Sequence, residues 1–448
     1  MKKTDLTEGA IWKQMLLFAL PVFLSNLLQQ FYNAFDSWCV GNFISEDALA
    51  AVSSSGSLIF MMVGFFNGTA MGAGVIIARY FGAKDYEPMR KAIHTVVAFG
   101  LVCGVVLTVA GVAFTPVILR WMDTPEEVLP QSITYFRFYF CGAIFTVMYN
   151  IFVGILHAVG DSRHPLYYLI LSSLLNVLLD LLFVAVLGFG VGAAALATTL
   201  SQGLSALLCL WQLTHTRDVY RLELKAIRFH KKSLGEILRY GLPSGVQNSV
   251  ISIANVVVQS NINAFGKAAM AGCGAYSKIE GFAFLPITCF TQALSTFVGQ
   301  NLGAKNYPRV KQGVAFGLGC SVLLSEIIGL MLWLFAPELI AFFNDTPEVV
   351  EYGARHMRTI SLFFCLLAFS HCIAAVLRGA GKATVPMFTM MACWCILRVG
   401  YITAAMHFIG DFSVISWAYP LTWLSSGIVF SIYFFKADWM HAFERETR

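Results

Sequence analysis

The sequence carries little charge. Asp, Glu, Lys and Arg together make up 12% of its 448 residues, which is about half of their share in soluble domains. Hydrophobic residues make up 58%, so there is too little polar surface to cover a soluble globule. The composition therefore excludes a soluble protein and indicates a chain that folds in lipid.

Motifs for metal binding and covalent catalysis are also missing. The eleven cysteines are scattered through apolar runs, and their only close pair, Cys393 and Cys395, lacks the second pair that a zinc site needs. No two histidines have the spacing of an HExxH-type metalloenzyme. We interpret the cysteines as small buried hydrophobes. We expect a protein that is not an enzyme and has no cofactor, with an intramembrane enzyme as the alternative from another class.

In place of these features the sequence has twelve apolar runs. Each is long enough to cross a hydrocarbon core of about 30 Å as a helix. No small-x-small cleavage site follows the first run, so it is expected to remain as a spanning helix. We predict an all-α, multi-pass integral membrane protein of the cell (cytoplasmic) membrane with twelve transmembrane helices. The predicted spans are residues 14–40, 48–78, 92–118, 132–157, 164–187, 190–213, 236–263, 270–299, 310–335, 352–376, 384–408 and 412–437.

The charges that are present alternate from loop to loop. Lys and Arg gather in every second loop, and Asp and Glu gather in the loops between. The positive-inside rule then places both termini in the cytoplasm, as an even number of spans requires. The long basic stretch 214–235 is expected to be a cytoplasmic linker between an N-terminal lobe (1–213) and a C-terminal lobe (236–448). Because topology explains the basic residues, no nucleic-acid partner is expected.

The two halves of the chain repeat one pattern. Segments recur about 221 residues apart: Gly-Ala-Lys-x-Tyr at 82–86 and 303–307, Asp-Thr-Pro-Glu at 123–126 and 345–348, and a Leu-to-Pro segment at 156–165 and 377–386. Each half contains an even number of predicted spans, so both halves lie the same way up. This arrangement predicts two pseudo-symmetric six-helix lobes related by an axis along the membrane normal.

A polar stripe runs along the first apolar run. Asn26, Gln29, Asn33 and Asp36 are spaced three or four residues apart, so they share one helix face, with Tyr32 beside them. A carboxylate at the centre of a spanning helix costs about 2.5 to 3.5 kcal/mol, and such acids usually face a cavity or an ion pathway. The alternative is a paired, structural Asp36 near the outer interface.

A second acid lies in the fifth apolar run. Asn176 and Asp180 are four residues apart and can point into the same cavity, and Thr198 follows in the sixth run. Carboxylate, amide and hydroxyl oxygens suit Na⁺, and two nearby carboxylates can instead share a proton. If Asp36 lies close to this pair, Asp36, Asp180 and Asn176 form a candidate site for Na⁺ or H⁺.

The second half keeps the stripe but not the acids. Asn255 occupies the repeat position of Asn33, and Gln259 follows it on the same face. Glu280 and Arg398 can form an interhelical ion pair, or Glu280 can bind substrate; the sequence leaves both readings open. Other polar residues in the apolar runs of this half are Lys278, Glu326 and His371, the last expected to be a satisfied interior histidine.

Two prolines occupy repeat positions near the starts of the first and seventh runs. Pro21 and Pro243 each remove a helical hydrogen bond and allow a bend. We therefore predict two hinges or fixed kinks at these positions.

The chain resembles the multidrug and toxic compound extrusion (MATE) transporters along essentially its whole length. The resemblance rests on the opening EGAIWKQMLLFALP, on P-x7-Q-x2-Y-x3-D from Pro21 to Asp36, on both GAK-x-Y segments and on N-x3-D at Asn176 and Asp180. It implies a V-shaped pair of six-helix lobes, working as a monomer in the bilayer, that exports small amphipathic organic cations in exchange for H⁺ or Na⁺.

The resemblance also implies roles for individual residues. Asp36 would be the central coupling carboxylate, with Asn176, Asp180 and Thr198 around it. The residues expected to line the substrate cavity are Gln29, Tyr32, Asn33 and Asn150 in the first half and Asn255, Gln259 and Glu280 in the second. One branch of the family has acids where this chain has Gln259 and His371, so the departure favours the DinF-like branch. A lipid-linked-precursor flippase of the same superfamily is the alternative transporter.

Overall fold

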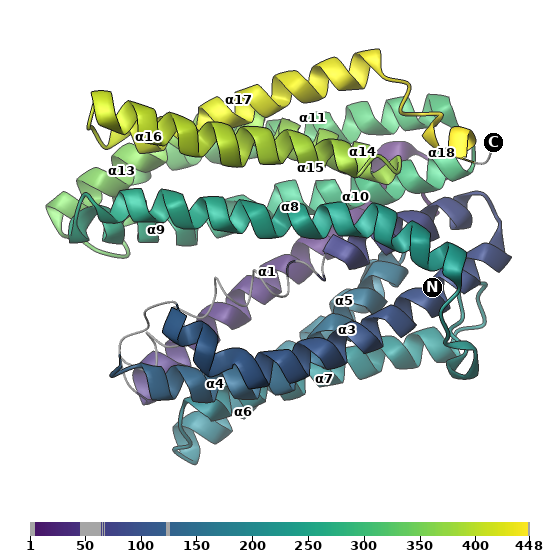
Figure 1. The fold of residues 1–448 in the computed structure, drawn as a ribbon, viewed down its shortest axis with the longest axis horizontal. Coiled ribbons are helices and arrows are strands. Elements are labelled where there is room, and N and C mark those ends of the chain that lie inside the picture. The colour runs from purple at the N-terminus through teal and green to yellow at the C-terminus, as the bar shows by residue number, and fades with distance from the viewer. Residues whose placement is uncertain (1–4, 45–63, 65, 67, 122–125, 447–448) are drawn as a thin grey trace. The chain divides into compact units, whose positions relative to one another are not determined.

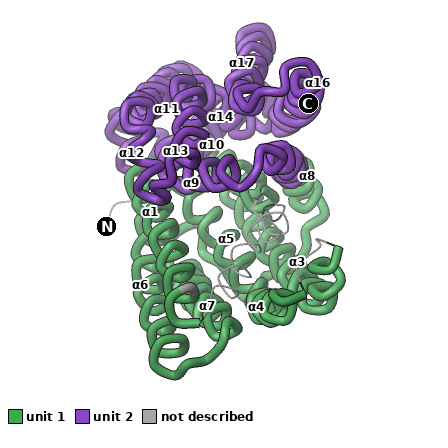
Figure 2. The backbone as a smooth tube through the Cα atoms, turned by 90° about the vertical axis from the view of Figure 1, so that its left-hand side faces the viewer, with its two compact units in different colours: residues 1–5, 20–245 green, residues 6–19, 246–448 purple. Residues whose placement is uncertain are grey.

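The computed structural model describes residues 5–44, 64, 66, 68–121 and 126–446. Within these ranges every long regular element is a helix (Figure 1). Contacts divide the chain into two compact units, residues 1–5 with 20–245 and residues 6–19 with 246–448 (Figure 2).

Unit 1 contains five long helices besides parts of two others, and residues 68–82 are also helical. Its elements are α3 (Tyr86–Trp121), α4 (Leu129–Cys141), α5 (Ala143–Ala158), α6 (Arg163–Asp180), the π-helix η1 (Leu181–Val186), α7 (Val191–His215) and the 3₁₀ turn η2 (Leu224–Ala226).

Unit 2 repeats the pattern with more interruptions. Its elements are α9 (Lys267–Ala283), α10 (Leu285–Gly303), α11 (Tyr307–Leu334), α12 (Ala336–Ala341), α13 (Pro347–Ser361), α14 (Phe364–Gly379), α15 (Thr384–Met390), the π-helix η3 (Met391–Leu397), α16 (Arg398–Phe408), α17 (Ser413–Lys436) and α18 (Ala442–Glu446). Two helices of 33 residues each, α1 (Ile11–Phe43) and α8 (Lys231–Asn263), contribute to both units.

The prediction of an all-helical, multi-pass membrane protein is confirmed. Seven described helices are long and apolar enough to cross a membrane, or up to ten if each of three bent helix pairs forms one span. Eleven predicted spans overlap a helix or a run of consecutive helices, whereas most of 48–78 lies outside the described residues. The count of twelve and the side of the termini stay predictions.

The internal repeat is present in the backbone. Lys84 and Lys305, the lysines of the two Gly-Ala-Lys segments, have φ of 56° and 57°, a left-handed conformation that is uncommon for a residue with a side chain. Gly160 and Gly381, in the second repeated segment, have φ of 85° and 78°. The two copies therefore turn the chain in the same way after equivalent helices.

Equivalent helices also pack in the same order. In unit 1, α3 contacts α4 and α5, and α7 contacts α4, α5 and α6. In unit 2 the counterparts agree: α11 contacts α13 and α14, and α17 contacts α13, α14 and α16. The pairs α4–α5 and α13–α14 are both bent, by 46° and 54°. The repeat therefore specifies the packing within each unit.

The boundary between the units falls inside helices. It lies between Ala19 and Leu20 in α1 and between Gly245 and Val246 in α8. Pro21 and Pro243 lie within three residues of these two points. The predicted bend positions therefore coincide with the places where each helix passes from one unit to the other.

The start of the chain is anchored in unit 2. Met15 and Phe18 of α1 are fully buried, and Asn301 Nδ2 donates to the Leu6 carbonyl at 3.1 Å. The guanidinium of Arg309 donates to the backbone carbonyls of Leu6 (3.1 Å), Gly9 (2.7 Å) and Glu8 (2.8 Å). One side chain thus holds the segment that precedes α1.

The first part of α8 is held in unit 1 by close backbone contact. A Cβ added to Gly72 would lie 2.3 Å from Cα of Gly241, and one added to Gly68 would lie 2.4 Å from the backbone nitrogen of Gly245. Two small-xxx-small pairs therefore face each other, which lets two helices approach more closely than side chains would allow. Tyr80 Oη also donates to the Glu236 carboxylate at 3.0 to 3.1 Å.

The segment predicted as a linker packs on α3. His94 Nδ1 donates to the Arg90 carbonyl at 2.7 Å, and its Nε2 accepts the backbone N–H of Glu223 at 3.1 Å. The backbone N–H of His230 donates to Thr95 Oγ1 at 3.2 Å. Two histidines therefore fasten the linker to unit 1.

Acidification is expected to loosen this linker. Burial, and then the nearby Arg228 guanidinium, lower the pKa of His230 in the folded protein. Docking of the linker is therefore fully stabilised above the pKa of an unfolded histidine, about 6.5, and is lost as pH falls from there through the lower folded-state pKa. Hydrogen exchange should show the amide of His230 losing protection by about threefold or more between pH 7.5 and 5.5, after correction for intrinsic rates. The segment around Thr216 is the control, because its amide donates to the Gln212 carbonyl at 3.1 Å and no imidazole takes part in that bond. Equal loss in both segments would contradict the prediction.

Candidate functional site

Both predicted acids of the first half are buried in unit 1. Asp36 of α1 is 7% exposed, and Asp180, the last residue of α6, is fully buried. Among the described residues, neither oxygen of Asp180 and not Oδ1 of Asp36 has a hydrogen-bond partner. Buried polar groups are usually paired, so these carboxyl groups are available for a ligand.

The structure brings the two acids together. Asp36 and Asp180 are close enough to interact electrostatically, and Tyr135 of α4 and Cys39 of α1 lie near both. Tyr135 and Cys39 belong to a cluster of buried, mostly apolar residues that includes Val184. The acidic pair therefore lies in a largely apolar surrounding, where a cation or a proton would stabilise it.

Asn176 lies one helical turn before Asp180 on α6. It is 1% exposed, and neither its Oδ1 nor its Nδ2 has a partner among the described residues. Directly after Asp180 the helix widens into the π-helix η1, an irregularity that is frequent at functional sites. Thr198 of α7 is half-buried and donates to the Ala194 carbonyl at 3.2 Å, which leaves its oxygen lone pairs available.

Asn176 and Thr198 border a small enclosed cavity of about 10 Å³ in unit 1. This volume is the space open to the centre of a water molecule, and a cavity of this size holds about one water. Gln202 Nε2 donates to Tyr32 Oη at 3.2 Å across it and links α7 to α1. The full lining is Tyr32, Leu169, Ser172, Ser173, Asn176, Thr198, Ser201 and Gln202.

The other residues predicted for the cavity of unit 1 have different surroundings. Gln29 is half-buried on α1, and Asn33 is exposed on the same helix. Asn150 of α5 is half-buried, and its Nδ2 donates to the Thr146 carbonyl of its own helix at 2.8 Å. Their roles toward a substrate stay predictions.

The polar stripe of unit 2 meets a buried arginine. Arg398 is 2% exposed and donates from Nη1 to Asn255 Oδ1 at 3.3 Å and from Nη2 to Thr422 Oγ1 at 3.1 Å. Its guanidinium also lies 5.2 Å from the centre of the Trp394 ring and 4.7 Å from that of Tyr419. Arg398 is thus held by two polar groups and two aromatic faces.

Glu280 does not form a direct ion pair with Arg398 within the described part of the chain. Its carboxylate accepts from Tyr276 Oη at 3.2 Å, and Arg398 acts on it only at longer range. The interhelical ion pair considered from the sequence is therefore wrong: the hydrogen bonds of Arg398 among the described residues go to Asn255 and Thr422. Glu280 is half-buried and keeps its candidacy as a substrate-cavity residue.

Most remaining polar residues of unit 2 have structural contacts. Gln259 is exposed and donates to Asn263 at 2.8 Å. Glu326 accepts the backbone N–H of Cys365 at 3.0 Å, and Lys278 lies over the Phe343 ring at 5.6 Å.

His371 contacts the rings of Phe284 and Trp394, but its buried Nε2 has no hydrogen-bond partner among the described residues. The expectation of a satisfied histidine is therefore wrong for that nitrogen.

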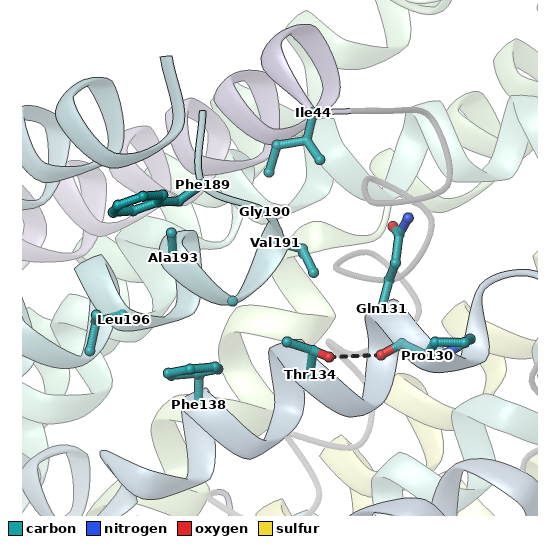
Figure 3. A pocket seen from close by; sticks show the side chains of 11 residues that line it. Ile44, Pro130, Gln131, Thr134, Phe138, Phe189, Gly190, Val191, Ala193 and Leu196 are labelled. Atoms are coloured by element: carbon teal, nitrogen blue, oxygen red, sulfur yellow. Dashed lines mark hydrogen bonds between the residues drawn. The ribbon is translucent and has the colours of Figure 1, made fainter. Parts of the chain in front are cut away.

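A larger pocket lies elsewhere in unit 1, between α4 and the start of α7 (Figure 3). Its volume is about 520 Å³, and apolar side chains such as Phe138, Phe189 and Leu196 dominate its lining. None of the predicted site residues lines it, and Thr134 uses its hydroxyl on the Pro130 carbonyl at 2.9 Å. It therefore lacks the charge that would select an ion.

Sequence reasoning missed three parts of the site. Tyr135 lies in the fourth apolar run, and no spacing there links it to the predicted stripes, so the sequence did not single it out. Gln202 lies four residues after Thr198 on the same helix face, and Ser172 lies four before Asn176, so both were visible as extensions of predicted stripes. Among the described residues no group of three His, Cys, Asp or Glu side chains could hold a metal ion.

A family model described as MatE matches the chain twice, over residues 21–182 and 243–402. The two matches begin at Pro21 and Pro243, the repeat positions discussed above. Together they cover more than half of the chain, in the same register as the internal repeat.

Curated relatives and solved structures agree with this match. The chain is 29% identical over 397 residues to "Probable multidrug resistance protein YoeA" of Bacillus subtilis, covering 87% of this chain and 86% of that protein. It is 27% identical over 389 residues to "Probable multidrug resistance protein NorM" of Thermotoga maritima, covering 86% and 83%. A solved MOP superfamily transporter from Pyrococcus furiosus, 24% identical, has a TM-score of 0.90 with 97% of each chain covered.

Proposed function

Because the chain belongs to the MatE family, we propose that it is a secondary active efflux transporter that exports small amphipathic organic cations in exchange for H⁺ or Na⁺. Relatives that match over most of their length are named as multidrug resistance proteins, which supports the substrate class. The protein is a multi-pass membrane protein, and we place it in the cell membrane as a monomer. It needs no cofactor besides the coupling ion.

The observation that carries this proposal is the pair of buried acids in unit 1. Asp36 and Asp180 are both less than a tenth exposed, and among the described residues three of their four oxygens have no hydrogen-bond partner. Stability alone does not favour such groups, because an unpaired carboxyl in hydrocarbon is costly. A protein that binds and releases a cation at each cycle does need them.

The proposed coupling follows from charge. An empty acidic pair attracts a cationic substrate, whereas protonation or Na⁺ binding at Asp36 and Asp180 weakens that attraction and releases the substrate outward. Asn176 and Thr198 would contribute neutral oxygens to the ion, and Gln29, Tyr32 and Asn33 would face the substrate. Inward movement of one positive charge contributes about 2.3 kcal/mol per 100 mV of membrane potential.

The proposed motion is a rocking of two units about α1 and α8. Pro21 and Pro243 lie next to the points where these helices pass between units, so they are proposed as the hinges. Bending there changes few contacts, because each helix segment stays packed in its own unit.

Removing the Arg309 side chain should weaken this arrangement. Arg309→Ala loses charge-assisted bonds to the carbonyls of Leu6, Glu8 and Gly9, each contributing about 1.5 to 3 kcal/mol. Limited proteolysis should then cut the segment before α1 several times faster, and export should slow, because the start of α1 is no longer fixed. Lys311→Ala is the matched control, since Lys311 is exposed on the same helix. Equal cleavage rates in both variants would contradict the anchoring role.

Reconstitution tests the proposed function. Proteoliposomes holding the purified protein should move a fluorescent organic cation against its concentration gradient when either a pH gradient or a Na⁺ gradient is imposed. Empty liposomes and a gradient-free sample are the controls. If neither gradient drives the cation, the antiporter proposal fails.

The competing functions have less support. A lipid-linked-precursor flippase would need a strongly cationic cavity, whereas the ionisable groups of unit 1 that are buried without a partner among the described residues include the carboxyls of Asp36 and Asp180 and no Lys or Arg. An intramembrane enzyme would need a reactive cluster, and within the described residues no such metal-binding group of side chains occurs. The DinF-like branch remains our proposal, because Gln259 and His371 replace the acids of the other branch.

A further inference from the structure

The interface of α6 and α7 in unit 1 carries two facing polar stripes. The stripe on α6 consists of Tyr168, Ser172 and Asn176, four residues apart, and ends at Asp180. The stripe on α7 consists of Thr198, Ser201, Gln202, Ser205 and Gln212. Their spacing of three, four or seven residues puts them on one face of the helix. The two helices pack directly against each other. We call this interface the α6–α7 seam.

Two hydrogen bonds cross the seam below the acidic pair. Ser205 Oγ donates to Ser172 Oγ at 2.6 Å, and both serines are buried. Tyr168 Oη donates to Gln212 Oε1 at 3.2 Å, nearer the linker end. Interhelical hydrogen bonds of this kind often serve only to join membrane helices. A further role for the seam therefore depends on its buried polar atoms that take no part in these two bonds.

Several buried atoms of the seam have no partner. Within the described chain these are both amide atoms of Asn176, Ser173 Oγ and Gln202 Oε1. All three residues line the enclosed cavity of about 10 Å³, which has room for one water molecule. Helix joining alone would not leave four unpaired atoms around a cavity, because each unmet group costs several kcal/mol in lipid. A water molecule that bonds to them removes this cost.

The seam ends at a carboxylate–imidazole pair. His164 Nδ1 lies 2.6 Å from Asp161 Oδ2, and the His164 ring lies 6.1 Å from that of Tyr168. The Asp161 side chain is 5% exposed, whereas that of His164 is 36% exposed. The pair therefore lies beside the Tyr168 end of the seam, with its carboxylate buried and its imidazole partly exposed at the start of α6.

The second copy of the repeat lacks this seam. The residues that occupy the positions of Ser172, Ser173, Asn176 and Asp180 are Cys393, Trp394, Leu397 and Tyr401. Those of Asp161 and His164 are Lys382 and Val385. Packing of the repeated helices therefore does not require the polar residues, which are present only in the unit that holds the acids.

We propose that the cavity binds an ordered water molecule and that the α6–α7 seam relays a proton between Asp180 and the Asp161–His164 pair. This inference rests on the proposed function and commits it to H⁺, because a cavity of one water does not pass hydrated Na⁺. A proton leaving the Asp180 carboxyl is taken up by the cavity water, which gives one of its own protons to the next oxygen. Each oxygen along the seam ends with the number of protons it began with. One proton is passed to His164 and leaves from there to bulk water.

Valine at position 201 tests the relay. Ser201 lines the cavity and donates to the Ala197 carbonyl at 2.8 Å, so Ser201→Val fills the water site, whereas Ser201→Ala leaves it open. Ser172→Ala breaks the Ser172–Ser205 bond without adding volume. The control is Ser431→Ala on α17, the counterpart of α7, where the hydroxyl bonds only to the Gly427 carbonyl.

The rate of pH-driven export of a fluorescent organic cation and its equilibrium Kd are measured for each variant. Ser201→Val should slow export by about tenfold or more with Kd within about twofold of wild type, and Ser172→Ala should slow it less. Ser201→Ala, which leaves the water site open, should slow export less than Ser201→Val does, and Ser431→Ala should stay near wild type. A structure at a resolution that shows waters should place one at the Asn176 amide.

An empty cavity in that structure, or wild-type export by Ser201→Val, would overturn the relay. Export driven by Na⁺ but not by a pH gradient would also overturn it, while leaving the antiporter intact. If the wild type exports no cation under either gradient, the antiporter proposal fails and the relay fails with it.

Discussion

Proteoliposomes that contain Asp36→Asn are expected to lose gradient-driven export altogether. Asparagine keeps the size of the side chain but can neither release a proton nor supply a carboxylate to Na⁺. The inside-to-outside ratio of a fluorescent cation should therefore stay at about 1 under any ion gradient, because the coupling free energy between ion and substrate is gone. The same result is expected for Asp180→Asn, whose side chain is fully buried near Asp36.

The control for these variants is an acid outside the pair. Asp411 lies between α16 and α17 and contacts Arg355 at 2.6 Å, and both side chains are more than a third exposed. Asp411→Asn should export at the wild-type rate, because a surface ion pair contributes only about 0 to 1 kcal/mol. Full export by Asp36→Asn, at normal expression and with normal elution as a single species, would show that Asp36 does not couple the ion.

Gly72→Ala is expected to destabilise the folded protein by about 1 to 3 kcal/mol, the usual cost of overpacking. The new methyl group would lie 2.3 Å from Cα of Gly241, and backbone atoms cannot swing away as a flexible side chain can. The helix 68–82 and the start of α8 must then separate, which also disturbs the segment beside Pro243. The measurement is the midpoint of thermal unfolding in detergent.

Gly235→Ala is the matched control on α8 itself. A Cβ at Gly235 meets no atom within 4 Å, so this change should be neutral or stabilise the helix by about 0.5 to 1 kcal/mol. Similar midpoints for Gly72→Ala and Gly235→Ala would contradict the close crossing of the two helices.

The sequence predicts the helices well because membrane thickness fixes their length. Residues 14–40 were predicted to span, and α1 covers Ile11–Phe43; for 384–408, the elements α15, η3 and α16 cover the same range. The internal breaks were not predicted. The bend between α4 and α5 occurs at Gly142 in an otherwise apolar run, and periodicity does not reveal where such a run changes direction.

The division into compact units was also beyond the sequence. Charge marked the stretch 214–235 as a linker, but contacts divide the chain inside α1 and α8. Which unit a helix segment joins depends on contacts such as that of Arg309 with Leu6 and the crossing of Gly72 with Gly241. The partners in these contacts lie far apart in sequence, so a single sequence gives no signal for them.

For the site, local spacing predicted more than distant contacts. From their i,i+4 spacing, Asn176 and Asp180 were predicted to be able to point into one cavity; both are buried in unit 1. Their closeness to Asp36 could only be supposed, since it depends on how α1 packs in the unit. Distant contacts were beyond reach: the sequence left open whether Glu280 pairs with Arg398, and the actual partners of Arg398, Asn255 and Thr422, come from two other helices.

Competition between ion and substrate at equilibrium tests the central claim most directly. The Kd of a fluorescent organic cation is measured on purified protein while pH is varied at fixed Na⁺ and Na⁺ is varied at fixed pH. If Asp36 and Asp180 bind ion and substrate in turn, Kd should rise as one of the two ions becomes more concentrated, and Asp36→Asn should remove that dependence. A wild-type Kd that changes with neither ion would contradict the account.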